Sequence, residues 1–122
     1  MIREAADKNN LRIEDGMPNK EDLISYINQN IYRPEEIRVK TTANHFNISQ
    51  NYFSNYFKRN FGMSYREYIN DYRIKLLERR IQSNQNTIKQ IADEFGFTDE
   101  SHLTNYFKKI KKISPTNFRK QQ

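Results

Sequence analysis

The sequence predicts an all-α protein built from two similar halves. Only three glycines and three prolines occur among its 122 residues, which favours long helices over a turn-rich β fold. Apolar residues recur at the i, i+3, i+4, i+7 spacing of a helix with one buried face. The tetrapeptide Asn-Tyr-Phe-Lys occurs at residues 55–58 and again at 105–108, which indicates that one helical segment is present twice.

The first residues are polar and lead into a capped helix. Residues 1–18 lack helical periodicity, which predicts a flexible lead or the remnant of a linker. A short helix over residues 2–8 is the alternative. Asn19 can cap the first core helix, which we expect over residues 20–32. Pro34 should end this helix, because a proline disfavours helical geometry in the residue before it.

Two further helices should complete the first half. The apolar spacing over residues 39–46 predicts a short amphipathic helix, followed by a turn at Asn47. Ser49 can cap the next helix, expected over residues 50–60. Gly62 should end it in the left-handed conformation that glycine tolerates best. The buried side of this helix should carry Phe53, Tyr56 and Phe57.

The longest predicted helix runs from Ser64 to Gln82. It opens with the capping box Ser64-x-x-Glu67 and contains neither glycine nor proline. Its apolar residues spread over more than one face, as expected for a connector packed between two subdomains.

The second half repeats this order of elements. A capping box at Thr87-x-x-Gln90 begins a short helix over residues 88–95. Thr98 is expected to cap the next helix, and Ser114-Pro115 to begin a short last one. Residues 119–122 should fray. The inward-facing residues of the longer helix should be Leu103, Phe107 and Ile110.

Aligning the halves shows the repeated unit. Residues 88–95 match 39–46 at an offset of 49, and residues 99–118 match 49–68 at an offset of 50. Each copy contains a short helix, a tight turn and a longer helix, which is a helix-turn-helix unit. We therefore expect a first subdomain at 19–64, a linker helix at 65–82 and a second subdomain at 83–122.

The charge is uneven along the chain. The net charge is +6 overall, but residues 37–122 hold sixteen basic and seven acidic side chains, a net charge of +9. Such an excess predicts a polyanionic partner, either nucleic acid or an anionic membrane. No apolar run approaches membrane-spanning length and no signal peptide is present, so we expect a cytoplasmic protein.

One stretch of the second half carries a family signature. The chain resembles the DNA-binding domain of the AraC/XylS family of bacterial transcription regulators over roughly residues 20–120. The residues that carry the resemblance are Ile88, Ile91, Ala92, Gly96, Phe97, Thr98, Asp99, Ser101, Leu103, Phe107, Lys108, Lys109, Ser114, Pro115, Phe118 and Arg119.

The resemblance implies about seven helices, with two helix-turn-helix subdomains joined by the linker helix. It implies binding to promoter or operator DNA by two major-groove recognition helices, a role as an activator, and RNA polymerase as a candidate second partner. Members often carry an effector-binding or dimerisation domain, for which this chain has no room, so we expect a stand-alone regulator or a fragment. Lys112 stands where the family usually has glycine, which allows a different end for that helix. Asn105 stands where the family often has arginine, which should alter the bases that are read.

Helical spacing separates the outward residues into two functional sets. Short polar side chains can hydrogen-bond to base edges, and asparagine suits adenine, which indicates A·T-leaning contacts. The base-reading candidates are Gln50, Asn51, Ser54, Asn55, Glu100, Ser101, Thr104 and Asn105. Basic residues at the helix ends should meet phosphates. The phosphate candidates are Lys58, Arg59, Lys108, Lys109, Lys111 and Lys112.

Two other interpretations remain open at this stage. The basic face could serve a protein-interaction module that binds an acidic partner, or the polar residues could form an ordinary solvated helix face. Enzymatic activity is not expected, because the sequence has no nucleophile elbow, phosphate-binding loop or HExxH pattern. The chain has no cysteine and only two histidines, so we expect no metal and no cofactor.

Overall fold

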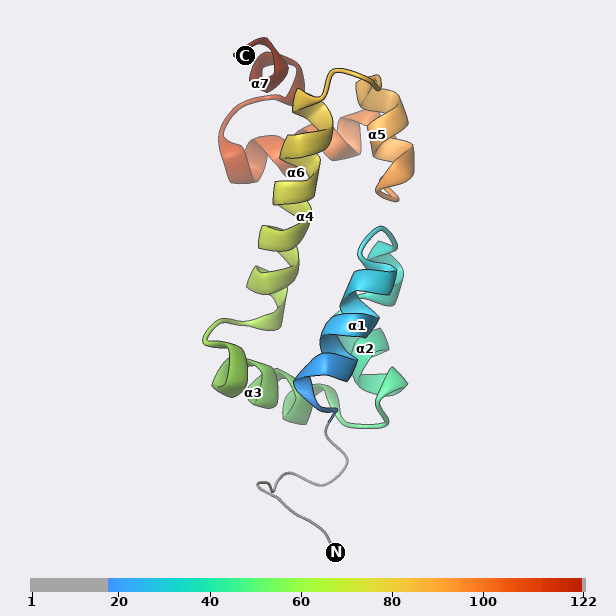
Figure 1. The fold of residues 1–122 in the computed structure, drawn as a ribbon, viewed down its shortest axis with the longest axis vertical. Coiled ribbons are helices and arrows are strands. Elements are labelled where there is room, and N and C mark those ends of the chain that lie inside the picture. Colours follow the sequence, from blue (N-terminus) through green and yellow to red (C-terminus); the bar gives the residue numbers. More distant parts are fainter. Residues whose placement is uncertain (1–17, 122) are drawn as a thin grey trace, which may run out of the picture.

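Residues 18–121 are described by a computed structural model, in which they form seven α helices, one short 3-10 helix and no strand (Figure 1). This confirms the all-α prediction. Of the predicted lead, residues 1–17 lie outside the described part, as does the alternative helix over residues 2–8. The elements are α1 (Lys20–Asn30), η2 (Pro34–Glu36), α2 (Val39–His45), α3 (Gln50–Phe61), α4 (Tyr65–Gln82), α5 (Ile88–Glu94), α6 (Glu100–Lys111) and α7 (Pro115–Lys120).

Pro18 corrects the predicted boundary of the flexible lead. Its side chain is buried, and its carbonyl accepts a hydrogen bond from the hydroxyl of Tyr56 in α3 at 2.7 Å. The packed structure therefore begins at least one residue earlier than the prediction placed it.

Side-chain caps begin most of the helices, as their sequences predicted. Asn19, Ser49 and Ser114 each accept a backbone N–H in the first turn of the following helix, and both predicted capping boxes form. The predicted cap at Thr98 is wrong. Asp99 caps α6 instead, because its side chain accepts the N–H of His102 at 2.8 Å.

The two longer helices of the repeated unit end in the same way. Gly62 after α3 has φ 77°, and Lys112 after α6 has φ 65°. Each donates its N–H to the carbonyl four residues earlier, in Lys58 and Lys108 respectively. The departure at Lys112 therefore leaves the helix end unchanged, and a lysine adopts a left-handed conformation that glycine adopts more easily.

Two hydrophobic clusters lie along α4, one in the first half (α1 to α3) and one in the second half (α5 to α7). In Figure 1, α4 runs between these two groups of helices. Tyr65 and Ile69 of α4 belong to the first cluster, whereas Ile74, Leu77 and Ile81 belong to the second. This confirms the prediction that the long helix is buried on more than one side.

Ile110 does not belong to the second cluster. The prediction that it faces inward is wrong, since its side chain is 37% exposed, whereas Leu103 and Phe107 are completely buried. Phe118 of α7 packs against Phe107, with 5.3 Å between ring centroids, and covers this end of the core.

The first cluster also contains a buried polar contact between α2 and α4. The hydroxyls of Thr42 and Tyr65 lie 3.0 Å apart. Burial raises the pKa of Tyr65 to about 12, and the hydrogen bond with Thr42 partly offsets this rise. The tyrosine therefore stays neutral at ordinary pH and can pair with a neutral hydroxyl.

Arg73, in the middle of α4, connects the two halves. It is only 4% exposed. Its guanidinium donates one hydrogen bond to the carbonyl of Ile31, after α1, and another to the carbonyl of Phe95, after α5, at 2.7 Å. The same guanidinium lies over the rings of Phe95 and Phe97. Burial lowers the pKa of Arg73, and Tyr106 offsets part of this decrease.

A second contact between the halves brings the loop after α1 against the turn after α5. The rings of Tyr32 and Phe95 meet edge to face, with 4.9 Å between centroids. A Cβ atom added to Gly96 would lie 2.6 Å from Cδ of Pro34. Gly96 also has φ 78°, so this position needs glycine both for its conformation and for the close approach.

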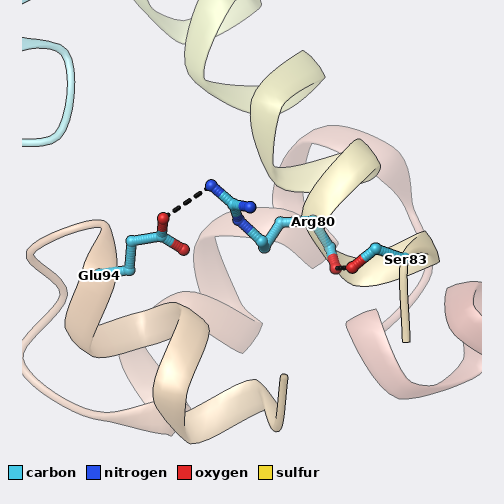
Figure 2. A network of polar contacts seen from close by, with 3 residues as sticks. All are labelled: Arg80, Ser83 and Glu94. Atoms are coloured by element: carbon cyan, nitrogen blue, oxygen red, sulfur yellow. Dashed lines mark hydrogen bonds and ion pairs between the residues drawn. The ribbon is translucent and has the colours of Figure 1, made fainter. Parts of the chain in front are cut away.

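Polar contacts attach α5 and α7 to the end of α4. Figure 2 shows the ion pair between Arg80 of α4 and Glu94 of α5, 2.7 Å long, and the hydrogen bond from Ser83 to the carbonyl of Arg80. Arg119 of α7 donates to the carbonyls of Ile81 and Asn86. The prediction that residues 119–122 fray is therefore wrong for Arg119, whose side chain closes the end of α4.

Arg73→Ala should lower the free energy of unfolding by about 2–4 kcal/mol, because two buried carbonyls lose their donor. Urea denaturation measures this change. Lys75→Ala, on the exposed side of the same helix, should cost less than about 0.5 kcal/mol. Equal losses for the two variants would show that the Arg73 contacts contribute nothing to stability.

Gly96→Ala should destabilise the protein more than Gly62→Ala, although both glycines have nearly the same positive φ. The conformation alone costs about 1 kcal/mol. At Gly96 the clash with Pro34 should add about 1–3 kcal/mol, whereas no atom lies within 4 Å of the position at Gly62. Thermal or urea unfolding of both variants compares them directly, and indistinguishable losses would contradict the close contact between the halves.

Lys112→Gly should raise the free energy of unfolding by about 0.5–1 kcal/mol. Glycine relieves the strain of about 1–2 kcal/mol that a lysine has in the left-handed conformation. Part of this gain is lost, because glycine also gives the unfolded chain more conformational entropy. Lys109→Gly, inside α6, should instead lower stability by about 1 kcal/mol. A decrease in stability for Lys112→Gly in urea denaturation would disprove the strain.

Candidate nucleic-acid interface

The two turns that position the longer helices have the same geometry. After α2, Asn47 has φ 61°, and the N–H of Ile48 donates to the carbonyl of Ala43 at 3.0 Å. After α5, Gly96 takes the place of Asn47, and the N–H of Phe97 donates to Ala92 at 2.9 Å. Both alanines are completely buried, so the short and the long helix of each unit approach closely. Each half therefore holds one helix-turn-helix.

The alignment of the two turns also explains why the cap of α6 was predicted at Thr98 and lies at Asp99. The offset between the halves is 49 up to Ile48 and Phe97, and 50 from Ser49 and Asp99 onward. Thr98 is thus the inserted residue, and Asp99 is the counterpart of the capping Ser49. The N–H of Thr98 donates a hydrogen bond to Nδ1 of His102 at 3.1 Å.

Helix α3 presents most of the predicted base-reading residues to solvent. Phe53, Tyr56 and Phe57 are buried on its inner side, as predicted. Gln50, Asn51 and Asn55 are exposed on the outer side, whereas Ser54 is half-buried at its edge. The exposed Tyr52, which the sequence analysis did not select, flanks this face with 41% of its surface accessible.

Helix α6 presents an equivalent face. Leu103 and Phe107 hold it against the core, and the exposed residues among those predicted are Glu100, Ser101 and Asn105. Thr104 is half-buried, at the position that corresponds to Ser54. The structure thus brings together the four base-reading candidates of α3 on one side of that helix, and the four of α6 on one side of α6.

The predicted phosphate-binding residues are not equivalent to one another. Lys58, Lys108 and Lys109 are exposed near the carboxyl ends of α3 and α6, and so are Arg59 and Lys112. Lys112 donates its ammonium group to the carbonyl of Lys109. Lys111 forms an ion pair with Glu78 of α4 and is therefore already partly neutralised.

A groove between the halves holds basic residues that the sequence analysis missed. It has a volume of about 630 Å³ and is lined by α4, by the segment from Pro34 to Val39 and by the start of α6. Arg38 and Arg66 both line it and are exposed. These residues are 28 positions apart in sequence, so no local pattern could have joined them.

The two histidines occupy surface positions. His45 is exposed and packs on the ring of Tyr26, with 4.3 Å between centroids. His102 lies on α6 beside the groove. Within residues 18–121, no group of three or more His, Cys, Asp or Glu side chains is arranged to hold a metal ion. No helix in that range has the length and hydropathy of a membrane-spanning segment.

Comparison with known proteins assigns this pair of units to a family. The model of a helix-turn-helix domain family of the AraC type matches residues 42–121, more than half of the chain. The chain belongs to the AraC-type helix-turn-helix family. It is therefore a DNA-binding domain of a transcription regulator and not an enzyme.

Two curated relatives illustrate the similarity of AraC-type sequences. The chain is 28% identical over 116 residues to an uncharacterised HTH-type transcriptional regulator, YtdP, of Bacillus subtilis, covering 95% of the chain and 15% of the relative. It is 30% identical over 93 residues to the HTH-type transcriptional activator RhaS of Pectobacterium carotovorum, covering 76% of the chain and 33% of the relative. The chain thus spans a third or less of the length of these two relatives.

Solved structures share the fold. The C-terminal domain of AraT, a response regulator from Geobacillus stearothermophilus, superposes with a TM-score of 0.76 at 21% identity, covering 89% of each chain. The C-terminal domain of the two-component response regulator yesN from Fusobacterium nucleatum superposes with a TM-score of 0.74 at 24% identity, covering 82% of this chain and 96% of that one. At these identities, the likeness establishes the architecture alone.

Proposed function

We propose that this AraC-type domain recognises a specific double-stranded DNA sequence by placing α3 and α6 in two major-groove segments. The observation that carries the proposal is the paired exposure of one polar face in each half. Asn55 and Asn105 are equivalent by the repeat, and both are exposed opposite a buried aromatic core. A solvated surface helix does not need the same asparagine and lysine in two copies.

The side chains on the two faces suit different bases. Asparagine forms two hydrogen bonds with adenine, so Asn51, Asn55 and Asn105 favour A·T pairs. Glu100 is the one acid among the eight candidates, and a carboxylate accepts a hydrogen bond from the N4 amino group of cytosine. Gln50 and Ser101 complete the exposed set, and Ser54 and Thr104 can contribute only from its edges. None of these residues is an arginine, so a guanine-binding fork is missing from both faces.

Phosphate contacts supply affinity without selecting the sequence. Lys58, Lys108 and Lys109 are best placed for this role, with Arg59 and Lys112 beside them. Lys111 contributes less because it is paired with Glu78.

The connection between the halves supports simultaneous binding. Successive major-groove segments on one side of DNA lie about 34 Å apart. Helix α4 has 18 residues and so spans about 27 Å at 1.5 Å per residue, a comparable length. Arg73 attaches α4 to both halves, so the two recognition helices are presented as a pair. We propose the first subdomain at 19–64, the linker helix at 65–82 and the second subdomain at 83–122 as its functional parts.

The cellular role that we infer is activation of transcription in the cytoplasm of a bacterium, with RNA polymerase as a second partner. The relative RhaS is named a transcriptional activator, which supports this role for a member of the family. A protein-interaction module is the alternative, since a basic helical face also suits an acidic protein.

A competition gel shift separates these functions. Sequences selected by the protein from a random duplex pool serve as the probe, and unrelated duplex serves as the competitor. Sequence-specific recognition requires that the selected sequence competes at least a hundredfold better than the unrelated one, as expected from typical specificity ratios of about 10³ or more. Equal competition by both would favour the protein-interaction alternative.

Asn105→Ala should weaken specific binding about 5- to 100-fold, corresponding to about 1–3 kcal/mol for a base contact, with little change for unrelated DNA. Fluorescence anisotropy with both duplexes measures the two affinities. The matched variant Lys108→Ala, on the same face, should weaken both equally. Equal losses for Asn105→Ala would argue against a base contact.

A further inference from the structure

Arg38 and Arg66 line the same groove between the halves. Arg38 directly precedes α2, and Arg66 lies in the first turn of α4. Both are exposed, and neither forms an ion pair within residues 18–121. Two exposed arginines, without an ion pair among the residues that the structure describes, therefore line this groove.

The remaining charges of the groove favour an anion. Arg73 forms part of its lining, and its charge is held there by two backbone carbonyls rather than by a carboxylate. Glu35 is the only acidic residue among the lining residues. Three arginines against one glutamate leave a net charge of +2. A small excess of this kind, at an open surface, attracts phosphate groups more than neutral ligands.

His102 adds a hydrogen-bond donor on the α6 side. Its Nδ1 accepts the N–H of Thr98, so in the neutral ring the proton is on Nε2. The side chain is exposed and lines the groove, which leaves Nε2–H available to an acceptor.

The groove lies between the two halves that carry α3 and α6. Its lining includes Tyr65 and Arg66 at the start of α4, which begins four residues after the end of α3, and His102 and Tyr106 of α6. A hydrogen bond from Tyr106 to Asn70 of α4 fixes the position of α6 beside it. When two helices occupy successive major-groove segments, the duplex between them exposes a minor groove bordered by two phosphate strands.

We propose that this groove is a third DNA contact, in which Arg38 and Arg66 bind backbone phosphates of the duplex segment between the two recognition helices. The proposal rests on the function proposed above. Guanidinium groups suit phosphate because they donate two hydrogen bonds in a fixed plane. The contact carries no base information, but it fixes the position of the domain along the duplex.

The test compares two double variants that each remove two positive charges. Arg38→Ala/Arg66→Ala removes the groove arginines. Lys75→Ala/Arg79→Ala removes two exposed charges of α4 that do not line the groove. Fluorescence anisotropy with the selected duplex at several salt concentrations gives the slope of log K against log salt. The groove variant should lower the size of this slope by about two, at roughly 0.9 per lost phosphate contact. The control variant should leave the slope close to that of the wild type.

Ethylation of single phosphates locates the contact. Ethyl groups on phosphates between the two major-groove sites should weaken DNA binding by the wild-type protein. The same ethyl groups should cause no additional loss of binding by the groove variant, which already lacks the contact. Interference near the ends of α3 and α6 should persist in both proteins. Since all four substituted residues are exposed, urea denaturation should show wild-type stability for both variants, so a loss of slope cannot be attributed to unfolding.

The possible outcomes distinguish this contact from the function on which it rests. A wild-type slope in the groove variant, while the wild-type protein still binds specifically, overturns the groove contact alone. A wild-type protein without specific duplex binding removes the proposed function and this contact with it. Inorganic phosphate is the probe for a small-anion site: saturable binding followed by NMR, lost in the groove variant while its DNA slope stays unchanged, would also overturn the DNA contact.

Discussion

The arrangement of the two halves depends on one buried cation in the middle of α4. Arg73 satisfies the carbonyl after α1 and the carbonyl after α5 with the two ends of its guanidinium. A buried charge is costly unless its hydrogen bonds are made, and here they are made only when both helices are docked on α4. The faces of Phe95 and Phe97 enclose the rest of the group. Docking of one half thus depends on the position of the other.

This dependence matters for the proposed DNA recognition, in which the spacing of α3 and α6 must match the duplex. A bare linker helix would leave each half to pivot about its end. Instead, the turn after α5 packs against Pro34 so closely that only glycine fits at position 96. Tyr106 ties α6 to α4 on the same side. The groove lined by Arg38 and Arg66 exists only because the halves are held in this relation.

Most local signals in the sequence were reliable, apart from the cap at Thr98, and the other errors came from distant contacts. The caps at Asn19 and Ser49, both capping boxes and the end at Gly62 each depend on residues within one helical turn. Helical spacing predicted a buried Ile110, but its side chain is exposed, and Phe118 of α7 packs against Phe107 at this end of the core. Arg119 was expected to fray, but two carbonyls more than thirty residues earlier accept its hydrogen bonds.

The sequence by itself determined the helices, the repeat of the helix-turn-helix unit and most of the residues that α3 and α6 expose. These follow from spacing within a helix and from side chains that hydrogen-bond to their own backbone. Only the tertiary structure showed how the halves are joined and where a groove forms between them. The residues responsible come from α1, α4 and α5, and a charge such as Arg73 reveals its partners only once the chain has brought those helices together.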